Sequence, residues 1–267
     1  MRKAVAAYLD WWREAGVGEA VTEAPANWFA LNERLAAAAQ VRQAPPVSPG
    51  PRQPPAPNAQ PIVQPPRASV MDPAIRDRLA TARTLEDLHT LLQGFEGCNL
   101  KATAKNLCFY RGAGQARLML IGEAPGRDED LAGKPFVGRA GQLLDRMLAA
   151  IGLDESSVHI TNTVYWRPPG NRTPSPEETL ACAPILARQM ELVDPKVVLL
   201  LGGVAAKSVL GLSEGILRLR GRWRSVVIGG RDVKTLATLH PAYLLRAPAA
   251  KRQAWQDLLM VEKALTE

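Results

Sequence analysis

The sequence predicts an α/β protein: a three-layer α/β/α sandwich around a central four-stranded, mainly parallel sheet, preceded by an N-terminal helical extension. Short, uninterrupted apolar runs are typical of parallel strands that are buried on both faces. Segments with helical spacing separate these runs, and this alternation indicates a parallel sheet covered on both sides. The four strands are expected at 116–122, 158–162, 196–201 and 233–239.

Helical spacing marks the segments between these strands. One or two helices are expected over 73–94, followed by helices over 142–148 and about 176–192. Within 84–87, a threonine precedes two acidic residues, which is the pattern of a helix N-cap with a favourably charged first turn. A glycine pair at 202–203 is expected to lead from the third strand into another helix.

Composition divides the chain into three segments. Residues 1–43 read as a helical extension, which we expect to pack on itself or on the main domain rather than form a DNA platform. Ten of the 22 prolines lie between 45 and 66. A segment so rich in proline favours extended geometry, so 44–71 is predicted to be a linker. The α/β/α domain is predicted over 72–267.

Charge and cysteine content narrow the class of protein. The 267 residues carry a net charge of +7, with a sequence pI of about 9.6. A basic chain favours a polyanionic partner, and a merely basic soluble protein is the alternative. No apolar run approaches the ~20 residues that span a bilayer. Three cysteines do not suggest a disulfide framework, and the chain is expected to be cytoplasmic.

Residues that could take part in binding or catalysis follow three of the predicted strands. The loop 122–141 holds acids, several glycines and one aromatic ring, Phe136. Asn162 ends the second predicted strand, and His240 follows the fourth. Open α/β sheets bind ligands beyond the carboxyl ends of their strands, so these segments are expected to form one composite site.

Three motifs in this order resemble those of the uracil-DNA glycosylase superfamily. They are GEAPGRDEDLAGKPFVGRAGQLLDRML from residue 122, ITNTVYWRPPGNRTPSPEE from residue 160 and HPAYLLR from residue 240. The resemblance covers about 95–265 and is closest to the family-four, iron–sulfur-type enzymes. It implies a DNA repair glycosylase that flips uracil out of DNA, hydrolyses its N-glycosidic bond and leaves an abasic site.

The resemblance assigns the base pocket to three side chains. Phe136 would stack on uracil, although a core ring is the alternative. The Asn162 carboxamide would pair with uracil O4 and N3–H, although the residue type is also common in turns and caps. His240 would donate a hydrogen bond to uracil O2 as negative charge develops, although a lone histidine after a strand is more often structural.

The acidic positions differ from the best-studied branch of the superfamily. Where that branch has a water-activating aspartate, this chain has Ala124. Glu123 is then expected to shape the uracil pocket and position water. Glu129 is expected to stabilise the sugar cation or orient its neighbours, with an acidic turn or helix cap as the alternative. Asn171 matches another site residue of the family, and alone would be read as a turn asparagine.

A second group of residues is expected to contact DNA. The segment after His240 would supply the wedge that fills the gap left by the flipped base, with Leu244 preferred over Tyr243. Arginines 218, 220, 222 and 224 alternate, so in one extended strand they would share a face. A charged edge strand explains the same pattern. The predicted DNA-binding residues are Tyr243, Leu244, Leu245, Arg246, Arg139 and Arg222.

The chain departs from the family-four pattern at the cluster cysteines. Its four corresponding positions are Phe95, Cys98, Trp166 and Cys182. A four-iron cluster needs four ligands, normally thiolates, and aromatic rings do not coordinate iron. We therefore expect no cluster and no other cofactor. Instead, Phe95 and Trp166 are expected to fill the space by apolar packing, with Cys98 and Cys182 as vestigial positions.

The sequence thus favours a monofunctional uracil-DNA glycosylase acting on single- or double-stranded DNA, as a cytoplasmic, nucleoid-associated monomer. Two alternatives stay open: an inactive DNA-binding homologue, and a glycosylase for hypoxanthine or xanthine. A nucleotide-dependent α/β enzyme ranks last, because no glycine-rich phosphate-binding motif follows a strand.

Overall fold

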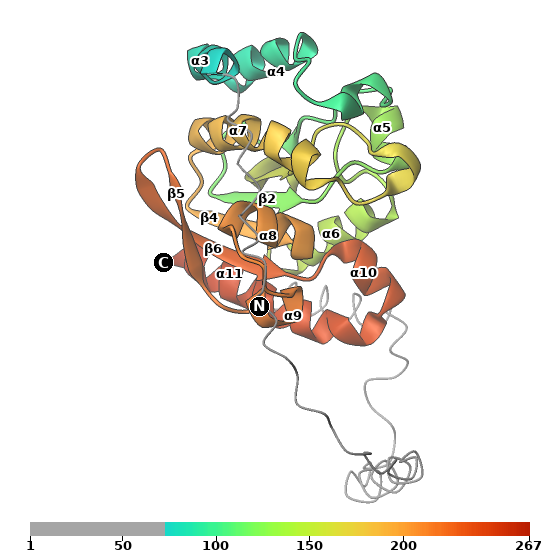
Figure 1. Ribbon diagram of the computed structural model, residues 1–267. Coiled ribbons are helices and arrows are strands. Elements are labelled where there is room, and N and C mark those ends of the chain that lie inside the picture. Colours follow the sequence, from blue (N-terminus) through green and yellow to red (C-terminus); the bar gives the residue numbers. More distant parts are fainter. Residues whose placement is uncertain (1–72) are drawn as a thin grey trace, which may run out of the picture. The chain divides into compact units, whose positions relative to one another are not determined.

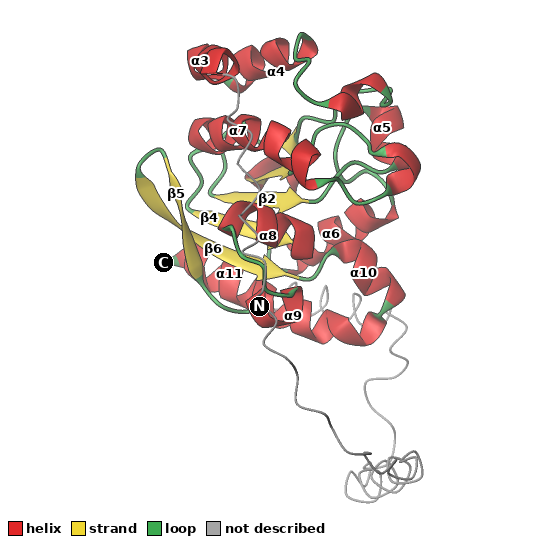
Figure 2. Ribbon diagram, in the orientation of Figure 1, coloured by secondary structure: helices red, strands yellow, loops and turns green. Residues whose placement is uncertain are grey.

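The computed structural model describes residues 73–267, which form a central sheet between layers of helices (Figure 1). The predicted helical extension (1–43) and the predicted linker (44–71) lie outside the described residues. The α/β/α class is confirmed, and Figure 2 shows the strands enclosed by helices.

The sheet has six strands in the order β1-β3-β2-β4-β6-β5 rather than the predicted four. Its inner four strands are parallel and correspond to the four predicted ones: β2 (Leu118–Gly122), β3 (Val158–Asn162), β4 (Val197–Leu201) and β6 (Arg231–Thr238). An antiparallel strand is added at each edge: β1 (Arg111–Gly112) and β5 (Arg224–Ile228). Neither edge strand gives an uninterrupted apolar run, since β1 has two residues and β5 alternates between exposed and more buried positions.

Alternating side chains of the inner strands enter two different cores. In β2, Leu118 and Leu120 pack with α6 (Arg139–Ala150) and α11 (Lys251–Thr266), whereas Met119 and Ile121 pack with α7 (Pro176–Val193) and α8 (Gly203–Leu210). Both faces are thus covered, which is why β2 and β4 are apolar without interruption. The last helix, α11, packs on the sheet through residues such as Leu258.

A further pair of helices packs on α7: α3 (Pro73–Thr81) and α4 (Leu85–Gln93) (Figure 1). The predicted cap is confirmed, because the Thr84 hydroxyl accepts the Asp87 backbone N–H while the Asp87 carboxylate accepts that of Thr84. The remaining helical segments connect these elements: η1 (Asn99–Ala102), α5 (Arg127–Ala132), η2 (Glu155–Ser157), η3 (Pro169–Asn171), α9 (Ile216–Leu219), α10 (Pro241–Arg246) and η4 (Pro248–Ala250).

A buried polar network joins β3 to α7. His159 Nδ1 lies 2.7 Å from the Ala113 carbonyl oxygen, and His159 Nε2 lies 3.0 Å from Gln189 Nε2. The Tyr165 hydroxyl donates to Gln189 Oε1 at 2.8 Å. Burial lowers the pKa of His159 to about 4. The ring is therefore neutral at physiological pH and fully paired in the core.

This shift makes stability depend on pH. Because the pKa of His159 is lower in the folded than in the unfolded chain, its contribution is complete above about pH 6.5 and is lost as the pH falls toward 4. We expect urea denaturation to show that the wild type loses on the order of 2 kcal/mol more than His159→Gln between pH 8 and pH 5. Equal losses in both proteins would contradict this assignment.

Candidate active site

A cavity of about 490 Å³ lies beyond the carboxyl ends of β2, β3 and β6. The neighbouring helices α5, α6 and α10 gather at the end of the sheet toward which the strand arrows point (Figure 1). Nine of the predicted site residues line this cavity: Glu123, Ala124, Glu129, Phe136, Asn162, Asn171, His240, Tyr243 and Arg246. The predicted composite arrangement is therefore present in the structure.

Phe136 forms one wall of the cavity in an uncommon backbone conformation. Its φ angle is 55°, in the left-handed region that costs a non-glycine residue free energy. A Cβ on Gly141 would lie 1.6 Å from the Phe136 carbonyl oxygen, so only glycine fits there. The Phe136 ring stacks on His240, with centroids 5.6 Å apart. Phe136 thus packs into the core while its ring lines the cavity.

Asn162 presents an unpaired acceptor at the end of β3. The residue is 1% exposed, and its Oδ1 has no hydrogen-bond partner within residues 73–267. Close packing holds it there, since a Cβ on Gly122 would lie 2.5 Å from Asn162 Oδ1 and 2.4 Å from the Phe136 ring. A buried acceptor without a partner costs about 1–3 kcal/mol, and a ligand with an N–H group relieves that cost.

His240 is the N-cap of α10 and is held as a neutral ring. Its Nδ1 accepts the Ala242 backbone N–H at 3.1 Å. Burial, with the nearby Arg246 charge, lowers the pKa of His240 to about 4. With Nδ1 accepting, the proton of the neutral imidazole resides on Nε2. His240 can therefore donate a hydrogen bond without carrying charge.

Glu129 connects the two loops on either side of α5. Its Oε2 accepts the Gly126 N–H at 3.0 Å, and its Oε1 accepts the Gly138 N–H at 2.9 Å. The Cys108 thiol donates to the Glu129 backbone carbonyl. With both carboxylate oxygens paired to backbone, the geometry favours the orienting role over stabilisation of the sugar cation.

Glu123 is the second carboxyl group in the cavity. Burial raises its pKa above the usual value, and a hydrogen bond with Thr173 partly offsets that rise. Sequence reasoning missed Thr173, which lies within the second motif but far from Glu123 in the chain. Asn171 lines the same side, with φ 57° and an Oδ1 that accepts Arg167 Nε at 2.7 Å. It is thus both a turn residue and a cavity residue.

The structure corrects the preferred DNA wedge. Leu244 is fully buried in the core beneath α10, so it cannot reach a DNA duplex. Leu245 is partly buried against the same core. Tyr243 is 42% exposed and lines the cavity, as does the exposed Arg246. Helical spacing explains the outcome, because positions three apart share a face and the leucines fall on the other side.

Two further predicted DNA contacts lie outside the cavity lining. Arg139 is exposed at the first position of α6, and Arg222 is exposed between α9 and β5. The proposed arginine ladder is wrong, because Arg218 lies in α9 and only Arg224 belongs to β5. Arg220 instead binds Asp257, with Nη2 and Oδ1 2.7 Å apart. A helical turn interrupts the alternation on which the prediction depended.

The cluster positions do not fit an iron–sulfur group. The Phe95 and Trp166 rings are buried and stack nearly parallel, with centroids 5.9 Å apart. Cys98 and Cys182 are buried in the same apolar cluster and share a thiol hydrogen bond. Within residues 73–267, no group of three or more His, Cys, Asp or Glu side chains could hold a metal ion. The rings occupy this region as packed side chains, and a four-iron cluster would need ligands at those positions.

Comparison with known proteins agrees with this geometry. Residues 109–259 match the family model described as the uracil DNA glycosylase superfamily. The chain belongs to this superfamily. The type-4 uracil-DNA glycosylase of Archaeoglobus fulgidus is 40% identical over 178 residues, covering 65% of this chain and 89% of that protein. The type-4 enzyme of Pyrobaculum aerophilum is 39% identical, with 66% and 92% covered. The type-5 uracil-DNA glycosylase of Mycobacterium bovis is 31% identical, with 49% and 56% covered.

For this superfamily member, exposure separates the two candidate wedges. We expect Leu244→Ala to destabilise the fold by about 2–5 kcal/mol, because it leaves a core cavity. Tyr243→Ala should change the free energy of unfolding by less than about 1 kcal/mol while weakening binding to uracil-containing duplex DNA. Urea denaturation and fluorescence anisotropy measure the two effects. A Tyr243→Ala variant with wild-type DNA affinity would argue against the wedge.

Proposed function

We propose that the protein hydrolyses the N-glycosidic bond of uracil in DNA, leaving an abasic site, and so initiates base-excision repair. The observation that carries this proposal is the unpaired Asn162 Oδ1 beside the Phe136 ring and the neutral His240. For a flipped base, Asn162 would read the hydrogen-bonding edge, Phe136 would stack on the ring, and His240 would stabilise the leaving group. The similarity to type-4 uracil-DNA glycosylases supports the same reaction.

Asn162 supplies the discrimination between uracil and cytosine. Its Oδ1 can accept a hydrogen bond from uracil N3–H, and its amide group can donate to O4. Cytosine has an unprotonated N3 and an amino group at C4, so it reverses both partners. A mismatched base would leave the buried amide unpaired. Phe136 supports the reading, since a stacked aromatic face contributes about 1–3 kcal/mol per base.

His240 stabilises the leaving group. As the bond to the sugar lengthens, negative charge accumulates on the base and reaches O2. A positioned neutral N–H donor at that oxygen is worth about 2.7–4 kcal/mol in comparable sites. The Ala242 N–H keeps Nδ1 as an acceptor, which directs the remaining ring proton to Nε2. His240 therefore acts through hydrogen bonding, without transferring a proton before the bond breaks.

Glu123 is the carboxylate available to position water. Ala124 has no titratable group, and both Glu129 oxygens are taken by backbone amides. Burial raises the pKa of Glu123, which makes its carboxylate a better proton acceptor than an exposed one. No lysine lines this cavity in the described domain, in agreement with a monofunctional glycosylase. A Glu123→Gln variant with an unchanged single-turnover rate would refute this role.

Excision from a single-stranded oligonucleotide with one uracil tests the proposal. We expect strand cleavage only after alkaline treatment, with none on a thymine control. His240→Ala should lower the single-turnover rate by about 10²–10³-fold. Equal rates for the wild type and His240→Ala would contradict the assignment.

The same assay distinguishes the alternatives. Binding without excision would indicate an inactive DNA-binding homologue, and excision of hypoxanthine or xanthine would indicate a broader base range. We also propose that the protein acts as a monomer in the cytoplasm, close to the nucleoid. No helix within residues 73–267 is long and apolar enough to span a bilayer.

A further inference from the structure

Helix α10 and its N-cap carry residues that line the cavity, and buried side chains of the helix fix it on the core. His240 caps its N-terminus, and the buried Pro241 and Leu244 fix the helix on the core. Tyr243 and Arg246 are three positions apart, are exposed and line the cavity. Any displacement of α10 would therefore move the catalytic ring and the two outward side chains together.

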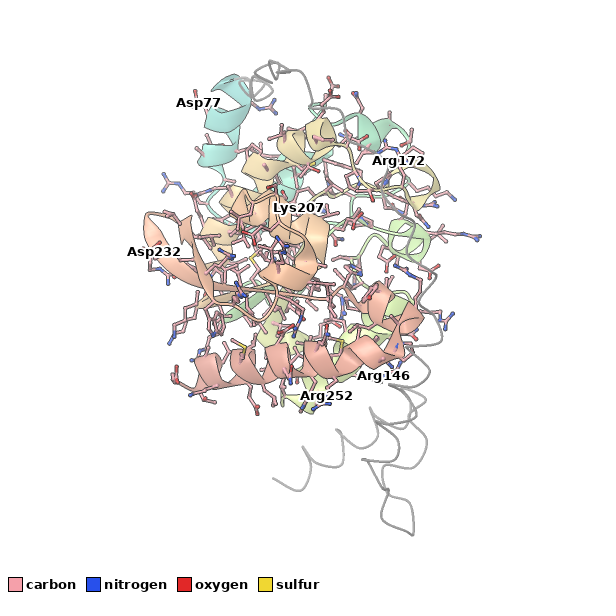
Figure 3. The ribbon with its side chains drawn as sticks, turned by 60° about the horizontal axis from the view of Figure 1, so that its bottom comes forward. Asp77, Arg146, Arg172, Lys207, Asp232 and Arg252 are labelled. Carbon is pink, nitrogen blue, oxygen red and sulfur yellow. The ribbon has the colours of Figure 1, made fainter. Side chains whose placement is uncertain are left out.

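Two arginines line the cavity, and their surroundings differ. Arg172 is held by Glu178 through two hydrogen bonds, Nη1–Oε2 at 2.8 Å and Nη2–Oε1 at 2.6 Å. Figure 3 shows Arg172 on an outer part of the molecule, away from α11, which carries Arg252. Arg246 has no acidic or hydrogen-bonding partner among the described residues. Its guanidinium is thus an unneutralised charge at the rim of the cavity.

We propose that Arg246 binds a phosphate of the DNA strand that carries the flipped nucleotide, and that it is a positioning residue for the base. A nucleotide whose base occupies the cavity must leave its own backbone at the rim, where the exposed Arg246 lies. Arginine suits this task because its planar fork can donate two hydrogen bonds to one phosphate. This inference rests on the proposed function, because it requires a nucleotide in the cavity.

The same charge acts on His240. Arg246 contributes to the lowered pKa of the His240 ring, second to burial. The other charged groups lining the cavity are Glu123, Glu129 and Arg172, from the loops and helix around it. In the free protein, Arg246 thus acts on the His240 ring as well as presenting its charge at the rim.

Salt dependence of binding tests the phosphate contact. The probe is a fluorescent single-stranded oligonucleotide with one 2′-fluoro-2′-deoxyuridine, whose electron-withdrawing fluorine slows cleavage. Between 50 and 200 mM salt, Arg246→Gln should lower the slope of log K against log salt by about 0.7, the value for one phosphate on a single strand. Arg246→Lys should keep most of the slope. Arg117→Gln is the matched control, because Arg117 is exposed just before β2, at the opposite end of the strands.

The pKa of His240 separates loss of the Arg246 charge from a structural effect of the substitution. We expect NMR titration of the free protein to show a higher His240 pKa in Arg246→Gln than in the wild type, with Arg246→Lys and Arg117→Gln unchanged. The direction follows because removing a nearby cation makes protonation of the ring easier. In steady-state excision, KM should rise more than kcat falls.

Failure of the Arg246 proposal can be told apart from failure of the proposed uracil excision. If the wild type excises uracil but Arg246→Gln keeps the wild-type salt slope, the Arg246 proposal is overturned, whatever the His240 pKa shows. The same holds if Arg117→Gln loses as much slope as Arg246→Gln. If the wild type itself excises no uracil, the proposed function fails, whatever the arginine variants show.

Discussion

The cavity depends on one carboxylate that holds two loops together. Glu129 accepts the Gly126 N–H with one oxygen and the Gly138 N–H with the other. These amides flank α5 and belong to the loops that carry Ala124 and Phe136. Without the bridge, two backbone donors would lose their partners, and the ring would lose one of the constraints on its strained backbone. A residue that resembles a catalytic acid in the sequence thus maintains the shape of the site.

Most of the fold follows from local sequence patterns. Strands β2 and β4 are uninterrupted apolar runs because α6 and α11 cover one face of the sheet and α7 and α8 cover the other. The edge strands β1 and β5 could not be predicted in this way, since β1 is too short and β5 is partly exposed. Their pairing is set by neighbours in space rather than by periodicity. The alternating arginines over 218–224 do not share one strand, because α9 interrupts the alternation.

The sequence predicted which residues line the site where a motif directly follows a strand. It did not predict which residues of α10 face the cavity, because that depends on the direction of each side chain. Phe136, Asn162 and His240 converge because parallel strands end at one edge of the sheet. The sequence pattern favours Leu244 as the wedge, but this residue is buried in the core, whereas the adjacent Tyr243 is exposed and lines the cavity. The contact of Thr173 with Glu123 depends on a loop path that no local pattern encodes. Sequence therefore located the chemistry better than it assigned roles within it.

Product inhibition by free uracil and by 3-methyluracil tests the central claim most directly, namely that Asn162 Oδ1 receives uracil N3–H. The two compounds differ by a methyl group that removes this donor and occupies its place. We predict that millimolar uracil inhibits excision from a uracil-containing oligonucleotide, whereas 3-methyluracil does not. In Asn162→Leu, any residual activity should be insensitive to both compounds. Equal inhibition of the wild type by the two compounds, or inhibition by neither, would contradict this account of the pocket.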